Sequence, residues 1–188
     1  MAANYYLLHA GYIRDGGASV GSSVSLIEDG DAVIVVDPGL VADRAAIFGP
    51  LREHGHGPED VTHVILTHHH PDHAVNAGLF PNAEVVDAWA RYVGDQWLDH
   101  SGDGYRVSPS VWLMLTPGHT SEDLTVMVDT ADGVVACTHA WWHADRTPEV
   151  DPLAEDQAAL ETSRQRILAG ADVVVPGHGE PFQTGRHR

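Results

Sequence analysis

The sequence has one cysteine, Cys137, among its 188 residues. A single cysteine excludes an internal disulfide, and it also excludes the paired thiolate ligands that hold most structural zinc ions. Because Cys137 ends the apolar run at residues 134–137, we predict that it is a small buried side chain. A metal site in this chain would therefore use nitrogen and oxygen ligands.

Positive charge is also scarce. The chain has no lysine, and its 10 arginines face 27 acidic residues, which gives a formal net charge of −17. Nucleic-acid binding depends on clustered positive charge, and here only Arg164 with Arg166 and Arg186 with Arg188 lie close together. We therefore predict a small-molecule substrate and disfavour a nucleic acid. Bound divalent metals would offset negative charge locally, so small anionic substrates remain compatible with this composition.

Long apolar runs are absent as well. No stretch approaches the roughly 20 residues that span a membrane, and the first residues lack the basic start and apolar centre of a signal peptide. We therefore predict a cytoplasmic protein with no membrane segment. The hydrophobic content of 43% and the length predict one globular domain over residues 1–188, while nothing in the pattern indicates an oligomeric state.

The strongest signal that is present is a histidine cluster at residues 67–73, Thr-His-His-His-Pro-Asp-His. It follows the apolar run at 61–66, which predicts a buried strand, and Pro71 favours the start of a helix directly after it. Imidazole nitrogens and a carboxylate oxygen suit Zn²⁺, Mn²⁺ or Fe²⁺. We therefore predict a catalytic metal site on a strand-to-helix turn.

Two further histidines and an aspartate occupy comparable positions. His119 and His178 each lie in a Pro-Gly-His turn, behind the apolar runs at 111–115 and 173–175, so each is expected at the end of a strand. Asp37 follows the apolar run at 32–36 and could orient a ligand histidine through a hydrogen bond; the alternative is a plain turn aspartate.

The remaining pattern predicts helices and strands that would cover and complete a sheet. We expect helices at 42–53, with a kink or a split at Gly49-Pro50, and at 156–169. We also expect a hairpin formed by 124–128 and 134–137, and a partly helical segment at 87–97.

These motifs together resemble the metallo-β-lactamase superfamily, whose pattern is an aspartate-ending strand, His-x-His-x-Asp-His, a later His, a bridging Asp and a final His. Within that superfamily the chain is similar to the group typified by metallo-β-lactamase domain-containing protein 1, through residues 60–62, 76–81 and 171–179. The resemblance implies an α/β fold, the four-layer αββα metallo-β-lactamase sandwich. Its motifs are specific for the fold but not for a substrate.

The resemblance also implies a ligand set. His68, His70 and His119 would hold one metal, and Asp72, His73 and His178 a second, with His69 outside both. The sequence departs from the pattern at the bridging aspartate, where His139 stands. A neutral imidazole has one lone pair and no charge, so it cannot bridge as a carboxylate does. His139 could bind one metal, hydrogen-bond to bound solvent or only pack, and Asp145 could supply a carboxylate from the following loop.

The function implied is hydrolysis by a metal-bound hydroxide, with Asp72 orienting or deprotonating the water. The expected substrate is a small-molecule ester, thioester, lactone, lactam or phosphodiester. We expect Zn²⁺ as the cofactor, as two ions of unequal affinity, with Fe or Mn as alternatives. Trp141, Trp142 and His143 are candidate substrate contacts, although buried packing of the aromatic rings explains them equally well. The alternative functions are a mononuclear iron enzyme similar to persulfide dioxygenases, and a metal-binding protein without turnover.

Overall fold

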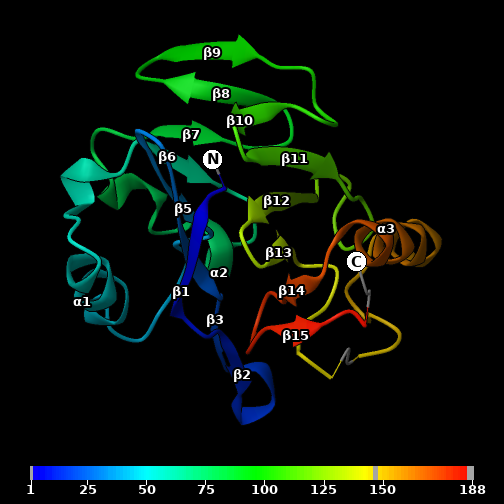
Figure 1. Ribbon diagram of the computed structural model, residues 1–188. Helices are drawn as coiled ribbons and strands as arrows, with labels where there is room; N and C mark the ends of the chain where they lie inside the picture. Colours follow the sequence, from blue (N-terminus) through cyan, green and yellow to red (C-terminus); the bar gives the residue numbers. More distant parts are fainter. Residues whose placement is uncertain (1, 146–147, 186–188) are drawn as a thin grey trace.

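The computed structural model describes residues 2–145 and 148–185, which fold mainly into two large β-sheets (Figure 1). The first sheet has the order β1 (Asn4–His9), β4 (Val24–Asp29), β5 (Ala32–Val36), β6 (His63–Ile65), β7 (Glu84–Val86), β8 (Ala90–Val93) and β9 (Gln96–Asp99). The second has the order β10 (Arg106–Ser108), β11 (Val111–Leu115), β12 (Leu124–Thr130), β13 (Gly133–Cys137), β14 (Val173–Val175) and β15 (Phe182–Gln183). Strands β2 (Tyr12–Arg14) and β3 (Ser19–Gly21) form a separate hairpin that projects from the body.

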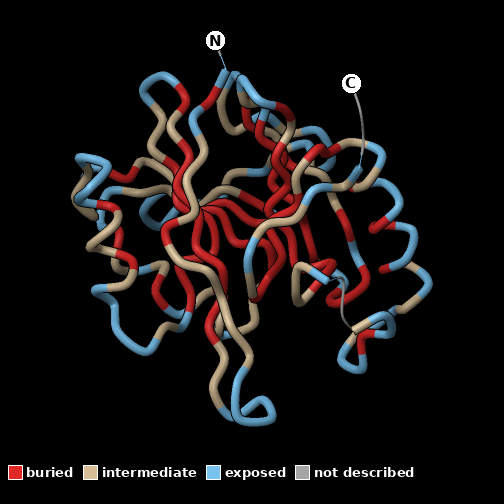
Figure 2. The backbone as a smooth tube through the Cα atoms, turned by 60° about the horizontal axis from the view of Figure 1, so that its bottom comes forward, coloured by how far each residue is buried: buried red, intermediate tan, exposed pale blue. Residues whose placement is uncertain are grey.

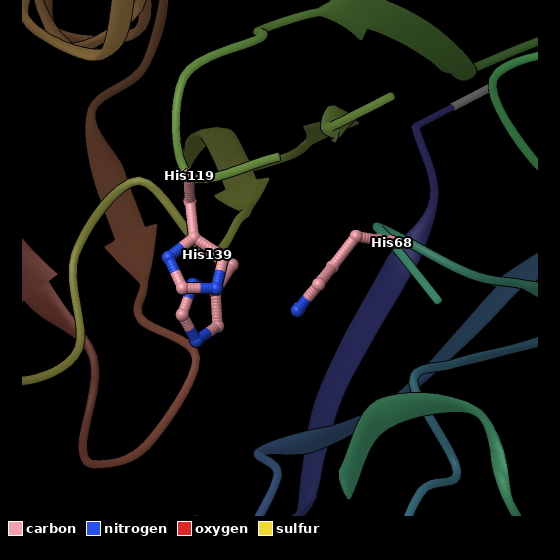
Figure 3. Close-up of side chains that lie close together, drawn as sticks. All are labelled: His68, His119 and His139. Carbon is pink, nitrogen blue, oxygen red and sulfur yellow. The ribbon is translucent and has the colours of Figure 1, made fainter. Parts of the chain in front are cut away.

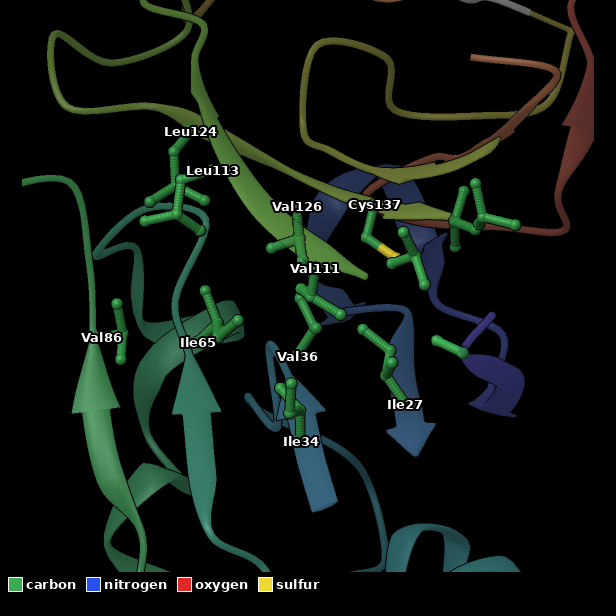
Figure 4. Packing of buried hydrophobic residues seen from close by; sticks show 14 residues of the cluster. Ile27, Ile34, Val36, Ile65, Val86, Val111, Leu113, Leu124, Val126 and Cys137 are labelled. Atoms are coloured by element: carbon green, nitrogen blue, oxygen red, sulfur yellow. The ribbon is translucent and has the colours of Figure 1, made fainter. Parts of the chain in front are cut away.

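Apolar side chains from both large sheets meet between them (Figure 4). Ile27 and Ile65 of the first sheet and Val111 and Val126 of the second are each fully buried in this cluster. The predicted buried position of Cys137 is confirmed, since it is 4% exposed within the same cluster. Burial on this scale, at roughly 25 cal/mol per Å² of apolar surface, holds the two sheets face to face.

Helices cover the outer face of each sheet (Figures 1 and 2). Helix α1 (Ala45–Glu53) buries Ile47 and Leu51 among apolar residues of the first sheet. Helix α3 (Gln157–Gly170) buries Leu160 and Ile167 against the second sheet. The predicted four-layer αββα sandwich is therefore confirmed. The remaining helices are short: η1 (Asp15–Gly17), η2 (Pro58–Asp60), α2 (Pro71–Ala74) and η3 (Ala77–Leu79).

Two local predictions were wrong. Residues 87–97 are not partly helical; they contain β8 and the start of β9, which pair as an antiparallel hairpin. Helix α1 also runs through Pro50 as one helix, so the chain does not split there. Among the described residues, no helix is long and apolar enough to cross a membrane.

Strand direction explains where the polar side chains gather. Strands β5 and β6 are parallel, as are β13 and β14. The carboxyl ends of parallel strands share one edge of a sheet, and in this chain the histidine-bearing turns follow those ends. The topology therefore brings segments far apart in the sequence to one rim of the sandwich.

Candidate metal centre

The structure brings together the seven predicted metal-ligating side chains at this rim. His68 and His70 follow β6, and Asp72 and His73 lie in α2, which begins at Pro71 as predicted. The other three residues are His119, His139 and His178, which follow the ends of β11, β13 and β14 in that order. Proline at the first helical position needs no hydrogen-bond partner for its nitrogen, so the turn can pass directly from the strand into the helix.

A first group of ligand atoms comes from His68, His119 and His139. One ring nitrogen from each lies within 4.8 Å of the others, and all three residues are buried. Figure 3 shows His119 and His139 on one side and His68 reaching toward them from the other. His70 adjoins this group, since its Nδ1 lies 3.1 Å from Nε2 of His119.

A second group comes from His73, His139 and His178, again with ligand atoms within 4.8 Å of one another. Nε2 of His139 lies 3.1 Å from Nε2 of His178. Asp72 adjoins this group, with Oδ2 at 3.5 Å from Nε2 of His73 and 3.6 Å from Nε2 of His178. His139 is thus common to both groups.

Hydrogen bonds on the far side of the rings orient three of the histidines. Nδ1 of His73 donates to Asp37 at 2.8 Å, and Nδ1 of His119 donates to Asp151 at 2.7 Å. Nδ1 of His178 donates to the carbonyl oxygen of Gly21 at 3.0 Å. A proton held on Nδ1 leaves the lone pair on Nε2, which is the arrangement that metal-ligating histidines use.

Asp37 occupies a constrained position. Its φ of 48° lies in the left-handed region that few residues other than glycine adopt. The carboxylate also accepts from the backbone nitrogen of Thr67 at 2.8 Å and from its Oγ1 at 2.6 Å. Asp37 therefore fixes the start of the histidine turn as well as the His73 ring.

Several nitrogens at the centre of the cluster have no hydrogen-bond partner. Nε2 of His68, Nε2 of His73 and Nδ1 of His139 are buried without a hydrogen bond. A buried polar atom without a partner costs roughly 1–3 kcal/mol, so three at one place require an explanation. A divalent cation provides one, because nitrogen-rich ligands with one carboxylate suit zinc and its transition-metal neighbours better than Mg²⁺ or Ca²⁺. The residues present fit a bound metal.

The comparisons with known proteins bear on the family and the fold. Residues 18–139 match the sequence model of the Metallo-beta-lactamase superfamily. The chain belongs to this superfamily. It is 39% identical over 175 residues to the human protein named Metallo-beta-lactamase domain-containing protein 1, covering 89% of this chain and 66% of that one. The chain thus spans just under two thirds of that relative's length.

Two other members are more distant. An N-acyl homoserine lactonase from Bacillus cereus is 31% identical over 157 residues, covering 72% of this chain and 62% of the lactonase. A structure of a metallo-beta-lactamase family protein from Thermus thermophilus superposes with a TM-score of 0.71 at 21% identity, over 96% of this chain and 75% of the other. At that identity the superposition shows the fold alone.

The centre of this superfamily member is held largely uncharged. Burial, with the neighbouring histidines, lowers the pKa of His68 and His139 well below the usual range. Burial also lowers the pKa of His178 to about 4. His73 differs: burial lowers its pKa, but the carboxylates of Asp37 and Asp72 outweigh burial and raise it. Neutral imidazoles have a lone pair available, so most of the cluster is ready to bind a cation.

A cavity of about 370 Å³ opens above the histidines. Its polar lining includes His70, Asp72, His119, His139 and His178, while the rest is formed by Ile13, Gly17, Val20, Leu40, Pro71, Trp142 and Leu153. No lysine or arginine is among the described residues that line it. Candidate metal ligands and apolar side chains thus line the same cavity.

The three candidate substrate contacts have different surroundings. Trp142 lines the cavity. Trp141 does not: it is 2% exposed and packs with Leu160 and Ile167 beneath α3, so the prediction of substrate contact was wrong for this residue and the packing alternative applies. Nδ1 of His143 donates to the carbonyl oxygen of His178 at 2.6 Å, which places it beside a candidate ligand.

Two other residues that the sequence placed near the centre are His69 and Asp145. His69 points to a separate set of partners, with Nε2 at 3.1 Å from Asp87 and Nδ1 at 3.3 Å from Glu122. Asp145 belongs to neither group of ligand atoms found among the described residues. Asp151 of the same loop contacts a candidate ligand, His119, and the sequence pattern did not indicate it. It lies 32 residues after His119, and no local motif marks the pairing.

Proposed function

We propose that this chain is a metal-dependent hydrolase that acts on small neutral esters or lactones with an apolar acyl group. The observation that carries the proposal is a cluster of histidines, three of them with a buried ring nitrogen that has no hydrogen bond, beside a largely apolar cavity that His139 and other histidines of the cluster line. The metal is expected to be Zn²⁺. The name of the Bacillus cereus relative, an N-acyl homoserine lactonase, supports the lactone class.

In this proposal His68, His70 and His119 hold one metal position, and Asp72, His73 and His178 hold another. A bound divalent cation would lower the pKa of water and polarise the scissile carbonyl, and the side chains of the site do not provide this activation by themselves. Asp37 and Asp151 keep the lone pairs of His73 and His119 on Nε2. These two carboxylates therefore hold the His73 and His119 rings in an orientation that suits metal binding.

Asp72 is the residue that we assign to proton transfer. It lines the cavity, its side chain is 22% exposed, and its Oδ2 faces two ligand histidines. From this position it can accept a proton from the attacking water and orient that water toward the carbonyl.

The apolar lining of the cavity favours a particular kind of substrate. Ile13 and Val20 of the β2–β3 hairpin, together with Leu40 and Leu153, would bury an acyl chain, at about 0.8 kcal/mol for each CH₂. A phosphodiester would bring a negative charge to a cavity with no lysine or arginine among its described lining residues. Esters and lactones thus fit better than phosphodiesters.

The test is a panel of neutral esters, thioesters, lactones, lactams and phosphodiesters, offered to the Zn²⁺-loaded chain without an affinity tag. We expect the highest kcat/KM for an ester or lactone with an apolar acyl group, and loss of turnover in His70→Ala. His69→Ala serves as the matched control, since it removes a neighbouring histidine that bonds to Asp87 and Glu122 instead.

Two results would reject the proposal. One is full metal occupancy with no turnover on any member of the panel, which would favour a metal-binding protein. The other is oxygen uptake on a persulfide by the Fe²⁺-loaded chain, which would favour the iron dioxygenase alternative.

A further inference from the structure

His139 is placed so that it can complete either group of metal ligands. It is the one residue shared by the group with His68 and His119 and the group with His73 and His178, among the described residues. Its ring lies 4.1 Å from the His119 ring and 5.0 Å from the His178 ring, measured between centroids. The side chain is 4% exposed, so solvent cannot readily substitute for it in either group.

The number of lone pairs on His139 limits what it can bind. A neutral imidazole carries a proton on one nitrogen and a lone pair on the other, so it can donate to one cation. A carboxylate at the same place could bind two cations through two oxygens and would add a negative charge. His139 therefore cannot serve both groups while it remains neutral.

We propose, on the basis of the metal centre described above, that the chain binds one divalent ion tightly and a second much more weakly, because His139 stands between the two groups of ligands and lacks the charge and the second donor atom of a bridging carboxylate. Two cations about 3.5–4 Å apart repel each other, and a neutral imidazole between them offsets none of that repulsion.

The experiment measures stoichiometry, and activity is not its readout. Untagged, metal-free protein is titrated with Zn²⁺ against a chromophoric chelator, and the bound metal is counted by elemental analysis after gel filtration. Co²⁺ absorption spectra follow the same titration. The variants are His139→Asp, which supplies a bridging carboxylate, and His139→Ala, which removes the shared ring; His69→Ala is the matched control.

The wild-type chain should bind one ion, with a second at least about a hundredfold weaker, at the upper end of usual coupling between sites. His139→Asp should bind two ions. His139→Ala should still bind its second ion weakly, because alanine supplies no bridging carboxylate. His69→Ala should match the wild type.

Three outcomes would overturn the inference: two wild-type ions with affinities within about tenfold, no bound ion at all, or a folded His139→Asp variant whose second ion binds no more tightly than that of the wild type. The last result would mean that a bridging carboxylate is not what the second position lacks. A chain that binds one ion but hydrolyses nothing would leave this inference standing and would reject the proposed hydrolase function.

Discussion

Replacing Asp151 with asparagine should weaken metal binding, although no pattern in the sequence connects Asp151 with a ligand. The carboxylate is buried and accepts three hydrogen bonds. Oδ2 accepts from Nδ1 of His119 at 2.7 Å and from Nε1 of Trp142 at 3.1 Å, while Oδ1 accepts from the backbone nitrogen of Leu153 at 2.9 Å. All three partners are donors, and an asparagine side chain has only one acceptor oxygen.

The size of the effect follows from this mismatch. The amide nitrogen of the new side chain would face at least one donor, so at least one bond to a charged acceptor is lost, at roughly 1.5–3 kcal/mol. We expect the free energy of unfolding of the metal-free protein to fall by about 2 kcal/mol, within that range. Losing the partner that orients a ligand histidine costs about 10- to 100-fold in metal affinity, or roughly 1.4–2.7 kcal/mol.

The assay is a Zn²⁺ competition titration on Asp151→Asn and on the wild type, with urea unfolding measured on the same preparations. Glu155→Gln is the matched control, because this exposed carboxylate of the same loop accepts from the backbone nitrogen of Ser121 and orients no ligand histidine. If Asp151→Asn folds and binds Zn²⁺ as tightly as Glu155→Gln, then Asp151 does not orient His119 for a metal.

Three further predictions concern other parts of the chain. In Gly177→Ala the new methyl group would overlap the His139 ring, so we expect reduced metal occupancy in a folded protein by elemental analysis; unchanged occupancy would refute that placement. The metal-free protein should lose stability as the pH falls from about 6.5 to 4. Folding lowers the pKa values of His68, His139 and His178, so the unfolded chain binds more protons over this range. The raised pKa of His73 opposes this loss of stability. Urea unfolding across that pH range checks this, and a flat or rising stability on acidification would contradict it. The chain should not bind RNA or DNA at physiological salt, given its −17 charge; a submicromolar affinity in a filter-binding assay would contradict this.

The sequence was most informative where an apolar run ends in a turn. The runs before His68, His119 and His178 became β6, β11 and β14, and the turns after them carry the histidines to one rim. This works because buried strands and Pro-Gly turns have local signatures. The aspartate after β5 could be placed at a strand end for the same reason, and its Oδ2 accepts from His73.

Contacts between distant loops could not be predicted in this way. Asp151 reaches His119, and the carbonyl oxygen of Gly21 reaches His178, only because separate loops fold over the same rim. The β8–β9 hairpin was missed for a different reason. Gly94, with a φ of 61°, and Asp95 form a tight turn, and this turn signal was outweighed by the helical composition of the surrounding residues.

The position of Trp141 also depended on tertiary packing. Adjacent aromatic residues after β13 could face the cavity or the core, and sequence alone left both open. In the structure Trp141 packs under α3 and Trp142 lines the cavity. Only the placement of α3 over the second sheet decides between the two.

The most direct test of the central claim, that the histidine cluster binds a cation that the chain uses for hydrolysis, is one titration with two readouts. Metal-free, untagged protein receives increasing Zn²⁺, and the bound metal and the hydrolysis rate of a neutral apolar lactone are measured on the same samples. We predict that the rate rises in proportion to bound metal and levels off near one ion per chain. A rate that is independent of bound metal, or no hydrolysis at full occupancy, would contradict the claim.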